Sequence, residues 1–494
     1  MVKSKTIINA TKWSVIGEIV AKLISPITTI ILARILAKEV FGIVASITTI
    51  VSLADLLTDA GFNAYIVQHE FGSDEEKEAT YNVCFWSNLA ISILLFFIIF
   101  FNNALFSRLV GASGYGLALI IASLVLPLTS ISSIEQAIMK RNLDFKKVGL
   151  IKIISKIIPL LTTIPLALLG QGYWSIIIGT LCGEVVSVIL CLIFGEYKPR
   201  FSYKIEYFGK IFSFSGWAFL ESILEWLLAN VAILVLANIY GNVYLGVFKT
   251  GLALITQITT AIYALYSNVF KSSVSREQND AEAFKRVFFA FQKYTSILSI
   301  PIGVGAFLYR GFLTKLLLGD GWEEAILLIG LWALVSLLSI AFGNFYSDSI
   351  RAKGKPKFLV LIDSIYLIAL IMLLVFAKNL SFDSFCIWFC LIKITQPLLQ
   401  VLFGVFICKI SFAKVLFNCY PQIIAVLVMV GFNFLIKFSE MSTWYSVLGI
   451  VLSAILYFIC LIILMPKKKE TLANIIDLVK KRKVEEGERE VSDE

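Results

Sequence analysis

About fourteen apolar stretches, each roughly 20 residues long, run along this chain, and they constrain its fold more than any other feature. A helix needs about 20 apolar residues to cross the hydrocarbon core of a bilayer. Hydrophobic residues make up 59% of the chain and charged residues only 16%. The sequence therefore predicts an all-α polytopic membrane protein. The predicted spans are residues 12–34, 40–62, 81–102, 115–136, 149–170, 172–195, 211–238, 243–268, 286–309, 322–346, 357–377, 384–407, 413–436 and 443–465.

The Lys and Arg residues alternate between the loops, and this predicts how the chain is oriented. Thirty of the 43 lie in the N-terminus, the C-terminal tail and every second loop, whereas the other loops carry only seven. Lys and Arg are enriched in the cytoplasmic loops of membrane proteins. We therefore expect both termini in the cytoplasm. The net charge of +9 does not indicate nucleic-acid binding, because the basic residues are spread over many loops and form no single patch.

The sequence contains no pattern that is typical of catalysis or of a metal site. The eight cysteines lie almost entirely within apolar spans, and the only histidine, His69, has no thiolate cluster beside it. Cys386 and Cys390 lie one helical turn apart, but we interpret all eight cysteines as small buried residues. A phosphate-binding loop is also missing. We therefore predict no enzymatic activity, no metal and no cofactor.

Two local matches indicate an internal duplication. Residues 33–42 and 237–246 each begin with Ala and end with Gly, and each joins two spans. The basic loop that begins at Lys140 corresponds in position to the loop that begins at Arg351. Six spans per repeat is an even number, so both halves share one orientation. The predicted parts are an N-terminal six-helix lobe, a C-terminal six-helix lobe, an accessory helix pair and a cytoplasmic tail, which comprise residues 1–210, 211–410, 411–465 and 466–494. The tail has the pattern of a short amphipathic helix on the membrane surface, with a solvated tail as the alternative.

Lysines inside the spans are the strongest candidates for a functional site. An ionisable side chain at the centre of a bilayer costs on the order of 3 kcal/mol, so it needs a reason to be there. Lys152 is close enough to a span end to reach the surface. Glu18 and Lys22 can instead form a structural ion pair. A wet cavity with several lysines attracts an anion. We predict that an anionic substrate binds to five of them, namely Lys22, Lys156, Lys249, Lys293 and Lys393.

Acidic residues inside the spans are candidates for ion coupling or gating. Glu221 and Glu225 lie one helical turn apart and cannot neutralise each other, so they must face water, an opposite charge or a ligand. For Asp55 we predict a site for a coupling cation, whereas Asp59 lies at the end of its span and is expected to cap or anchor the helix. The complete set of candidates is Glu18, Asp55, Glu184, Glu221 and Glu225.

Three local motifs resemble a known family. Residues 32–36 (LARIL), followed by Phe41 and Gly42, are similar to the opening of polysaccharide flippases of the Wzx type. Residues 59–68 (DAGFNAYIVQ) and 141–145 (RNLDF) continue the resemblance. This family belongs to the multidrug/oligosaccharidyl-lipid/polysaccharide exporter superfamily.

The resemblance covers the whole chain in layout and is specific mainly over residues 1–150. It implies fourteen helices in two six-helix lobes and a final pair. It also implies a substrate of oligosaccharide on a polyprenyl diphosphate, which is moved from the inner to the outer leaflet of the bacterial cytoplasmic membrane by alternating access. Such transport serves the synthesis of O-antigen, capsule or exopolysaccharide. The implied partners are the lipid-linked anionic oligosaccharide, membrane lipids, a polysaccharide polymerase and other export components.

Several other functions are compatible with a fourteen-span chain. A flippase for the peptidoglycan lipid precursor shares the anionic substrate, and only the local motifs favour the polysaccharide branch. A multidrug exporter of the same superfamily would need an acidic cavity for its cationic substrates. A membrane glycosyltransferase or polymerase typically has a large outer loop, and the outer loops of this chain are short. A scaffold protein would have no use for lysines inside its spans.

Overall fold

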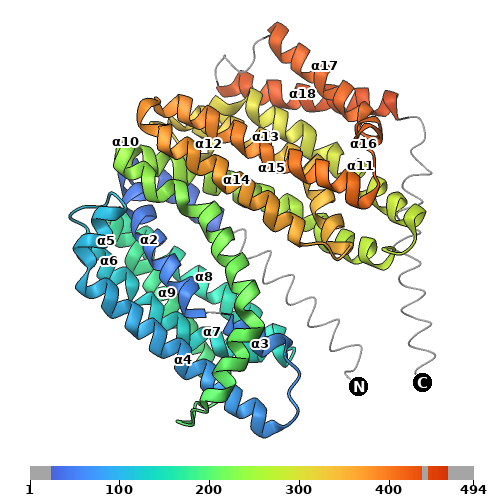
Figure 1. Cartoon of the computed structure of the whole chain (residues 1–494). Coiled ribbons are helices and arrows are strands. Elements are labelled where there is room, and N and C mark those ends of the chain that lie inside the picture. The colour runs from blue at the N-terminus through green and yellow to red at the C-terminus, as the bar shows by residue number, and fades with distance from the viewer. Residues whose placement is uncertain (1–23, 60, 437–442, 466–494) are drawn as a thin grey trace. The chain divides into compact units, whose positions relative to one another are not determined.

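The computed structural model describes residues 24–59, 61–436 and 443–465, and every regular element within these ranges is a helix (Figure 1). The predicted all-α fold is therefore confirmed. In the first part of the chain, a helix over Ile24–Ala33 is followed by α2 (Lys38–Asp59), α3 (Phe62–Gln68), α4 (Asp74–Phe101), α5 (Asn103–Leu109), α6 (Gly116–Ser123), α7 (Val125–Arg141), α8 (Phe145–Leu168) and α9 (Tyr173–Phe194). The second part contains α10 (Ile205–Arg276), α11 (Ala281–Leu308), α12 (Arg310–Leu318), α13 (Ala325–Ala352), α14 (Lys357–Phe376), the short 3-10 helix η1 (Ala377–Asn379), α15 (Phe382–Cys408), α16 (Phe412–Asn418), α17 (Tyr420–Ile436) and α18 (Thr443–Leu464).

The helices coincide with the predicted spans. Within the described residues, eleven helices are long and apolar enough to cross a membrane, or twelve if α16 and α17, which meet at a bend of 61°, form one span. Helix α10 contains two predicted spans, 211–238 and 243–268, and its backbone leaves the helical conformation between them at Gly241 (φ 84°, ψ 170°). The predicted span 12–34 lies partly outside the described residues. A polytopic membrane fold is thus confirmed, and the number of fourteen spans stays a prediction.

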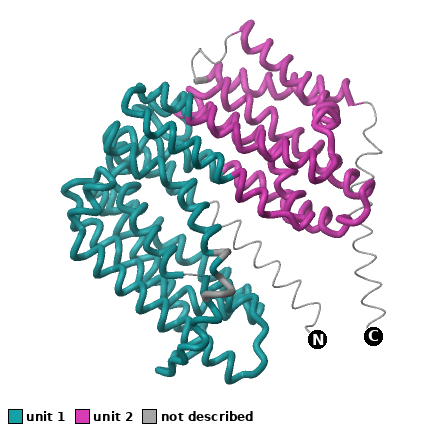
Figure 2. The backbone as a smooth tube through the Cα atoms, in the orientation of Figure 1, with its two compact units in different colours: residues 1–257, 315–328, 363–388 teal, residues 258–314, 329–362, 389–494 magenta. Residues whose placement is uncertain are grey.

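The chain divides into two compact units (Figure 2). The first unit contains α2 to α9 and the first part of α10, and the second contains the end of α10, α11, and α16 to α18. The first comprises residues 1–257, 315–328 and 363–388, and the second comprises residues 258–314, 329–362 and 389–494. Contacts within each unit therefore define which candidate residues lie together.

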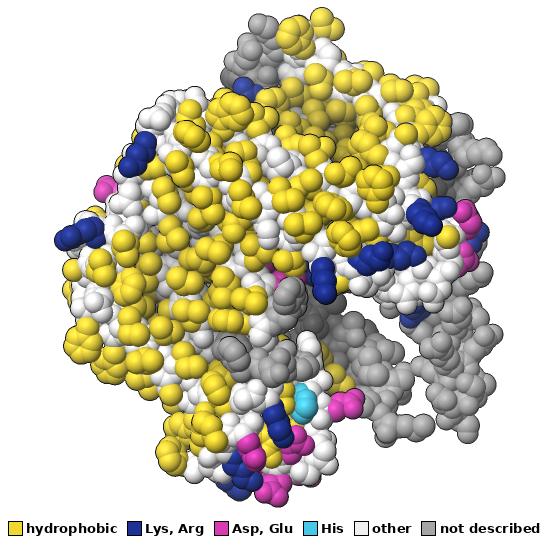
Figure 3. All heavy atoms as spheres, viewed as in Figure 1, with side chains coloured by type: hydrophobic (Ala, Val, Ile, Leu, Met, Phe, Trp, Pro, Cys, Tyr) yellow, Lys and Arg dark blue, Asp and Glu magenta, His cyan; other side chains and the backbone are white. Residues whose placement is uncertain are grey.

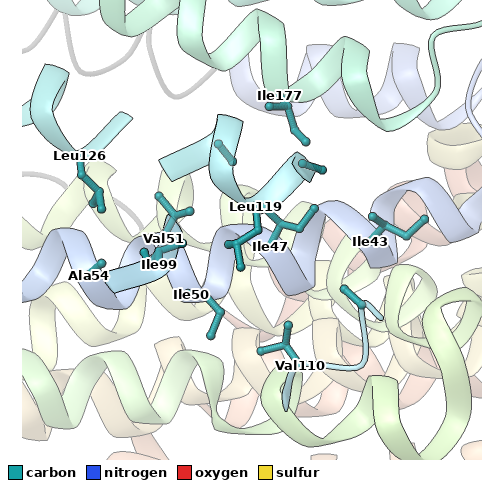
Figure 4. Close-up of a cluster of buried hydrophobic side chains, with 13 residues drawn as sticks. Ile43, Ile47, Ile50, Val51, Ala54, Ile99, Val110, Leu119, Leu126 and Ile177 are labelled. Atoms are coloured by element: carbon teal, nitrogen blue, oxygen red, sulfur yellow. The ribbon is translucent and has the colours of Figure 1, made fainter. Parts of the chain in front are cut away.

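The core of the first unit is built around α2 (Figure 4). Apolar residues recur along this helix at intervals of three and four, so they share one face, and that face is buried. Residues of α6, α7 and α9 pack against it. The cluster includes Ile43, Ile47, Ile50, Val51, Ala54, Leu119, Leu126 and Ile177. This packing leaves the polar residues Ser52, Asp55 and Asp59 on a different face of α2.

The core of the second unit is largely aromatic. The rings of Phe270 and Phe345 meet edge to face with centroids 4.9 Å apart, and Tyr346 lies 5.1 Å from Phe288. All four rings are at most 1% exposed. Aromatic pairs in this geometry add stability beyond the apolar area that they bury. The end of α10 is thereby fixed against α11 and α13.

The surfaces of both units are unusually apolar. Hydrophobic side chains cover most of the face of each unit that is visible in Figure 3, and charged side chains form small groups. Leu192 in the first unit is 71% exposed, and Phe406 in the second unit is 74% exposed. Soluble monomers rarely expose contiguous apolar patches larger than a few hundred Å². These surfaces therefore belong in lipid, as the span pattern predicts.

Two turns that correspond in the predicted duplication have the same backbone conformation, which the end of α8 also adopts at Gly170 (φ 79°), so the duplication stays a prediction. Each turn ends a long helix, α7 or α13, with a residue at positive φ, which is Leu143 (φ 62°) in one and Gly354 (φ 68°) in the other. Three backbone hydrogen bonds recur at corresponding positions. They join Asn142 to Ile138, Leu143 to Lys140 and Asp144 to Met139 in the first turn, and Lys353 to Ser349, Gly354 to Arg351 and Lys355 to Ile350 in the second. The two loops that correspond in sequence thus share one conformation.

A glycine on α9 makes a first prediction about packing. A Cβ atom at Gly183 would lie 2.6 Å from Cγ of Pro159 and 2.8 Å from the carbonyl oxygen of Ser155 on α8. Overpacking of this kind costs ~1–3 kcal/mol. We expect Gly183→Ala to lower the thermal unfolding temperature of the protein in detergent. Gly209→Ala is the matched control, because a Cβ atom there meets nothing within 4 Å, and equal unfolding temperatures for both variants would contradict the packing.

Candidate functional site

The structure describes eight of the ten predicted site residues, since Glu18 and Lys22 lie outside the described residues. Lys156 on α8 and Lys249 on α10 belong to the first unit, whereas Lys293 on α11 and Lys393 on α15 belong to the second. The two pairs are therefore each described within their own unit. A single cavity that contains all of these lysines stays a prediction.

Three predicted residues come together in the first unit, although they lie on different helices. The hydroxyl of Thr129 on α7 donates a hydrogen bond to Oδ1 of Asp55 on α2, at 2.7 Å. The carboxyl of Glu184 on α9 is close enough to interact electrostatically with both Lys156 and Asp55. The carboxyl group of Asp55 and the ammonium group of Lys156 thus lie within electrostatic range of Glu184 across α2, α8 and α9, and a shared site for the three stays a prediction.

The polar face of α2 also contacts the first part of α10. The indole Nε1 of Trp226 donates a hydrogen bond to Oγ of Ser52 at 3.0 Å. Glu225 precedes Trp226 and is exposed, whereas Glu221, one turn earlier, is half-buried. Both predicted acids thus lie on the helix that covers the Ser52 side of α2.

Asp59 ends α2, as the sequence predicts. Its Oδ1 accepts a hydrogen bond from the backbone N–H of Asn63 at 3.3 Å, and Gly61 between them has a φ of 83°. Positive φ is readily adopted by glycine because it has no Cβ atom. Asp59 therefore anchors the start of α3 through Asn63, although the N-cap residue of that helix is Gly61, so of the expected roles of capping or anchoring it is the anchoring that the structure shows.

Lys249 lies on the part of α10 that follows the break at Gly241. Its side chain is half-buried, and within the described residues its ammonium group has no ion-pair or hydrogen-bond partner. Taking an uncompensated charge out of water costs several kcal/mol. The residue therefore requires water or an anion beside it. Among the predicted lysines, it is the clearest candidate for contact with an anionic ligand.

The two predicted lysines of the second unit have different surroundings. Nζ of Lys393 donates a hydrogen bond to Oε1 of Gln396 and lies 5.7 Å from the ring centroid of Trp332. That ring stacks on Phe389, with centroids 5.3 Å apart. Cation–π contact of this kind orients a lysine without neutralising it. The side chain of Lys293 is half-buried, and its backbone oxygen accepts hydrogen bonds from side chains on α11 and α17.

Sequence reasoning missed one polar cluster in the second unit. Asp348 on α13 is only 4% exposed, and both of its carboxylate oxygens lie within hydrogen-bonding distance of the Tyr263 hydroxyl, at 2.8 and 2.9 Å. Nζ of Lys271 is 3.5 Å from Oδ1 of Asp348 and 5.2 Å from the Tyr263 ring. The predicted span stops at residue 346, so Asp348 was not among the acidic residues considered inside the spans. An i,i+3 spacing to Arg351 was the signal that the helix continues.

Removing the Tyr263 hydroxyl is expected to destabilise the second unit. Tyr263→Phe leaves the buried Asp348 carboxylate with fewer donors, and an unsatisfied buried acceptor costs ~1–3 kcal/mol. We expect a lower thermal unfolding temperature in detergent. Tyr420→Phe is the control, because its hydroxyl makes only a long hydrogen bond of 3.4 Å at an exposed position. An unchanged unfolding temperature for Tyr263→Phe would show that Asp348 does not depend on it.

The sequence as a whole matches a known family. The profile of the family described as "Polysaccharide biosynthesis protein" matches residues 31–327, which is more than half of the chain. The chain belongs to this family. The resemblance that we drew from residues 32–42 is thereby confirmed.

Two relatives of this family member are similar to it over about two thirds or more of its length. It is 26% identical over 359 residues to the lipopolysaccharide biosynthesis protein WzxC of Escherichia coli (strain K12), and the alignment covers 72% of this chain and 71% of the relative. It is 25% identical over 335 residues to the succinoglycan biosynthesis transport protein ExoT of Rhizobium meliloti (strain 1021), with 67% of each chain covered.

Two solved structures share the fold of this polysaccharide biosynthesis protein. The lipid II flippase MurJ in an inward closed conformation aligns with a TM-score of 0.72 and 16% identity, over 92% of this chain and 98% of MurJ. An inward-facing multidrug resistance transporter of the MATE family and MOP superfamily aligns with a TM-score of 0.59 and 15% identity, over 80% of this chain and 98% of the transporter. These likenesses show the polytopic transporter fold.

Proposed function

We propose that this chain is a flippase, which moves an oligosaccharide linked to polyprenyl diphosphate from the inner to the outer leaflet by alternating access. The observation that carries this proposal is Lys249, a half-buried ammonium group within an apolar helix and without an acidic partner among the described residues. A diphosphate is the type of anion that such a lysine binds as a point charge. Membership of the polysaccharide biosynthesis family supports this class of substrate.

The proposed reaction is movement without covalent chemistry. The sugar requires a wet cavity, the diphosphate requires positive charge, and the prenyl chain can stay in lipid. In this proposal Lys22, Lys156, Lys249, Lys293 and Lys393 contact the substrate. Glu18, Asp55, Glu184, Glu221 and Glu225 bind a coupling cation or gate the cavity, and the Asp55–Glu184 pair is supported by its position next to Lys156. No residue is assigned a catalytic role.

Orientation and partners follow from the same proposal. The bias of Lys and Arg places both termini on the cytoplasmic side of the bacterial cytoplasmic membrane. The flipped product must then meet an enzyme that polymerises or transfers the oligosaccharide at the outer face. A polysaccharide polymerase is therefore the proposed functional partner.

The main alternative is a flippase for the peptidoglycan lipid precursor, because MurJ is a lipid II flippase with the same fold. The substrate of this alternative differs from the proposed substrate in its sugar and shares the diphosphate. A multidrug exporter is favoured less, since a cationic drug would be repelled by an uncompensated lysine.

Reconstitution separates these possibilities. Purified protein in liposomes is supplied with three fluorescent probes, namely a polyprenyl diphosphate oligosaccharide, lipid II and a cationic dye. We expect the first to reach the opposite leaflet at a rate above that of empty liposomes, as measured by accessibility to a membrane-impermeant quencher. Movement of lipid II alone would favour the peptidoglycan alternative, and dye transport alone would overturn the proposal.

A further inference from the structure

The stretch that resembles Wzx-type flippases forms half of a closed contact in the first unit. Nη2 of Arg34 donates a hydrogen bond to the carbonyl oxygen of Leu316, at 2.6 Å. Nε1 of Trp322 donates one to the carbonyl oxygen of Ala33, at 3.1 Å. The motif residues therefore hold α12 and the segment that follows it, although nearly 290 residues separate them along the chain. We call this contact, formed by residues 33–42, 237–246 and 315–324, the closure.

The backbone contact within the closure is reciprocal. A Cβ atom at Gly42 would lie 1.9 Å from the carbonyl oxygen of Asn242, and a Cβ atom at Gly246 would lie 1.9 Å from that of Lys38. Gly42 corresponds to Gly246 in the predicted repeat, and Lys38 corresponds to Asn242. The two copies of the turn therefore touch through the same pair of positions. Only glycine permits this approach of α2 to α10.

Two hydrogen bonds from side chains to backbone carbonyl groups also correspond in the predicted repeat. Arg34 donates to the carbonyl oxygen of Leu316 at the end of α12. Asn238, which corresponds to Arg34, donates to the carbonyl oxygen of Leu109 at the end of α5, at 2.8 Å. Helices α5 and α12 follow the third and the ninth predicted spans, so they also correspond. The closure thus joins both repeats symmetrically, except that one turn carries cations and the other carries amides.

The cationic turn lies beside a cavity of about 780 Å³. Its volume is within the range of small-molecule sites. Two of its charged groups, Lys315 and Asp320, pair with each other at 2.8 Å. Lys38 forms an ion pair with Glu324, which does not line the cavity. The charged lining residues are Arg34, Lys38, Lys315 and Asp320, and the backbone of Gly319 and Gly321 completes one side.

Glu324 is held as an anion by this pairing. Burial acts to raise the pKa of the Glu324 carboxyl, but the hydrogen bond and the charge of Lys38 outweigh it, so the pKa lies below its ordinary value. At neutral pH the ion pair therefore links the segment before α13 to the start of α2.

We propose that this cavity binds a diphosphate group, and that binding opens the closure by taking Lys38 from Glu324 and Arg34 from the Leu316 carbonyl. The inference rests on the proposed function, because the diphosphate of a lipid-linked oligosaccharide is its natural ligand. Inorganic pyrophosphate has the same chemistry and is the alternative source.

Competition for two cations is the physical basis of the proposal. A diphosphate offers several anionic oxygens, whereas Glu324 offers one charge and the Leu316 carbonyl is neutral. Arg binds phosphate through paired hydrogen bonds, and charged hydrogen bonds are about twice as strong as neutral ones. Once Arg34 and Lys38 bind the ligand, the hydrogen bond from Trp322 to Ala33 is the remaining one of the three side-chain contacts that hold residues 315–324. A ligand can shift a conformational equilibrium only by such a difference in affinity, and here the open closure offers both cations.

Hydrogen exchange tests the proposal without altering the protein. Full-length protein in lipid nanodiscs, which expose both faces, is compared alone, with inorganic pyrophosphate, and with polyprenyl diphosphate in the nanodisc. We expect peptides that cover residues 315–324 to exchange roughly tenfold faster with the ligand, because the opened segment loses the contacts that restrain its local unfolding. A response to the lipid identifies the headgroup as ligand, and a response to pyrophosphate alone identifies a soluble anion. No response to either overturns the proposal.

Two variants and a control sharpen this test. Glu324→Gln should raise the exchange of residues 315–324 without ligand and reduce the further effect of ligand, whereas Lys38→Gln should abolish the response to ligand. Lys204→Gln, which removes a 3.1 Å ion pair with Glu75 elsewhere in the first unit, should leave the response at the wild-type level. A wild-type response in Lys38→Gln would overturn the site.

The flipping assay keeps this result separate from the proposed function. If wild-type protein flips the lipid-linked oligosaccharide and the diphosphate leaves exchange unchanged, the cavity proposal fails and the flippase proposal stands. If exchange responds but no lipid is flipped, the cavity proposal stands as an anion site and the flippase proposal fails.

Discussion

Lys249→Ala is expected to slow the flipping of a polyprenyl diphosphate oligosaccharide about 10- to 100-fold, because a charged hydrogen bond is worth ~1.5–3 kcal/mol. The ammonium group is half-buried and has no acidic partner among the described residues, so no ion pair is broken by its removal. Protein stability should therefore be retained or increased. The measurement is the flipping rate in liposomes, together with thermal unfolding in detergent.

Conservative and matched variants show whether the charge matters. Lys249→Arg should restore most of the rate, because it retains the positive charge and can bind phosphate. Lys285→Ala removes a half-buried lysine that pairs with the exposed Glu282 at 2.9 Å, and it should flip lipid at the wild-type rate. A Lys249→Ala variant that flips lipid as fast as wild-type protein would remove the main support for the anionic substrate.

Gly42→Val and Gly246→Val are each expected to reduce flipping by at least tenfold, since either side chain would overlap a backbone carbonyl oxygen of the other repeat. The variants should fold, because each change affects only the end of a helix at the closure. Their α2–α10 contact should not close, so the exchange of residues 237–246 should rise with that of residues 33–42. Flipping and hydrogen exchange are measured on the same nanodisc and liposome preparations.

The control for these substitutions is Gly305→Val on α11, where a Cβ atom meets nothing within 4 Å. It tests whether any valine in a long apolar helix impairs transport. Normal flipping by a folded Gly42→Val protein would show that the close approach of α2 and α10 is not needed in the cycle.

Much of the fold could be predicted because the bilayer sets the length of each helix. The apolar face of α2, from Ile43 to Ala54, follows from the spacing of its residues. The break at Gly241 lies between two predicted spans, as expected. The end of α2 at Asp59 was also predictable, because this acidic residue lies at the end of an apolar span. Each of these three features follows from residues that are close to one another in the sequence.

The site could be predicted only in part, because it depends on contacts between distant segments. Asp55, Glu184 and Lys156 were each predicted as functional, but their proximity requires the packing of α2, α8 and α9. Asp348 was not singled out from the sequence, because its partner Tyr263 lies on another helix. Charge patterns identify which residues are unusual in lipid and leave their partners undetermined.

Arg34 and Lys38 are a second case in which the sequence does not predict the partners of a charged residue. In the sequence they are two of the few basic residues in the loops predicted to lie outside, and only the topology could be argued from them. In the structure Arg34 is bound to Leu316 and Lys38 to Glu324. The basic residues within and beside the family motif are therefore explained by contacts with Leu316 and Glu324, which lie in a segment without a recognisable motif.

The reciprocal glycine contact has a consequence for the origin of the chain. In a homodimer with twofold symmetry, each residue pair across the interface occurs twice. Gly42 against Asn242 and Gly246 against Lys38 obey this rule within one polypeptide. An ancestor of half this length could have associated with its own copy through this surface. Fusion of the two copies would then have freed each half to diverge, so that one half carries Arg34 and Lys38 where the other carries Asn238 and Asn242, while the backbone contact has stayed reciprocal.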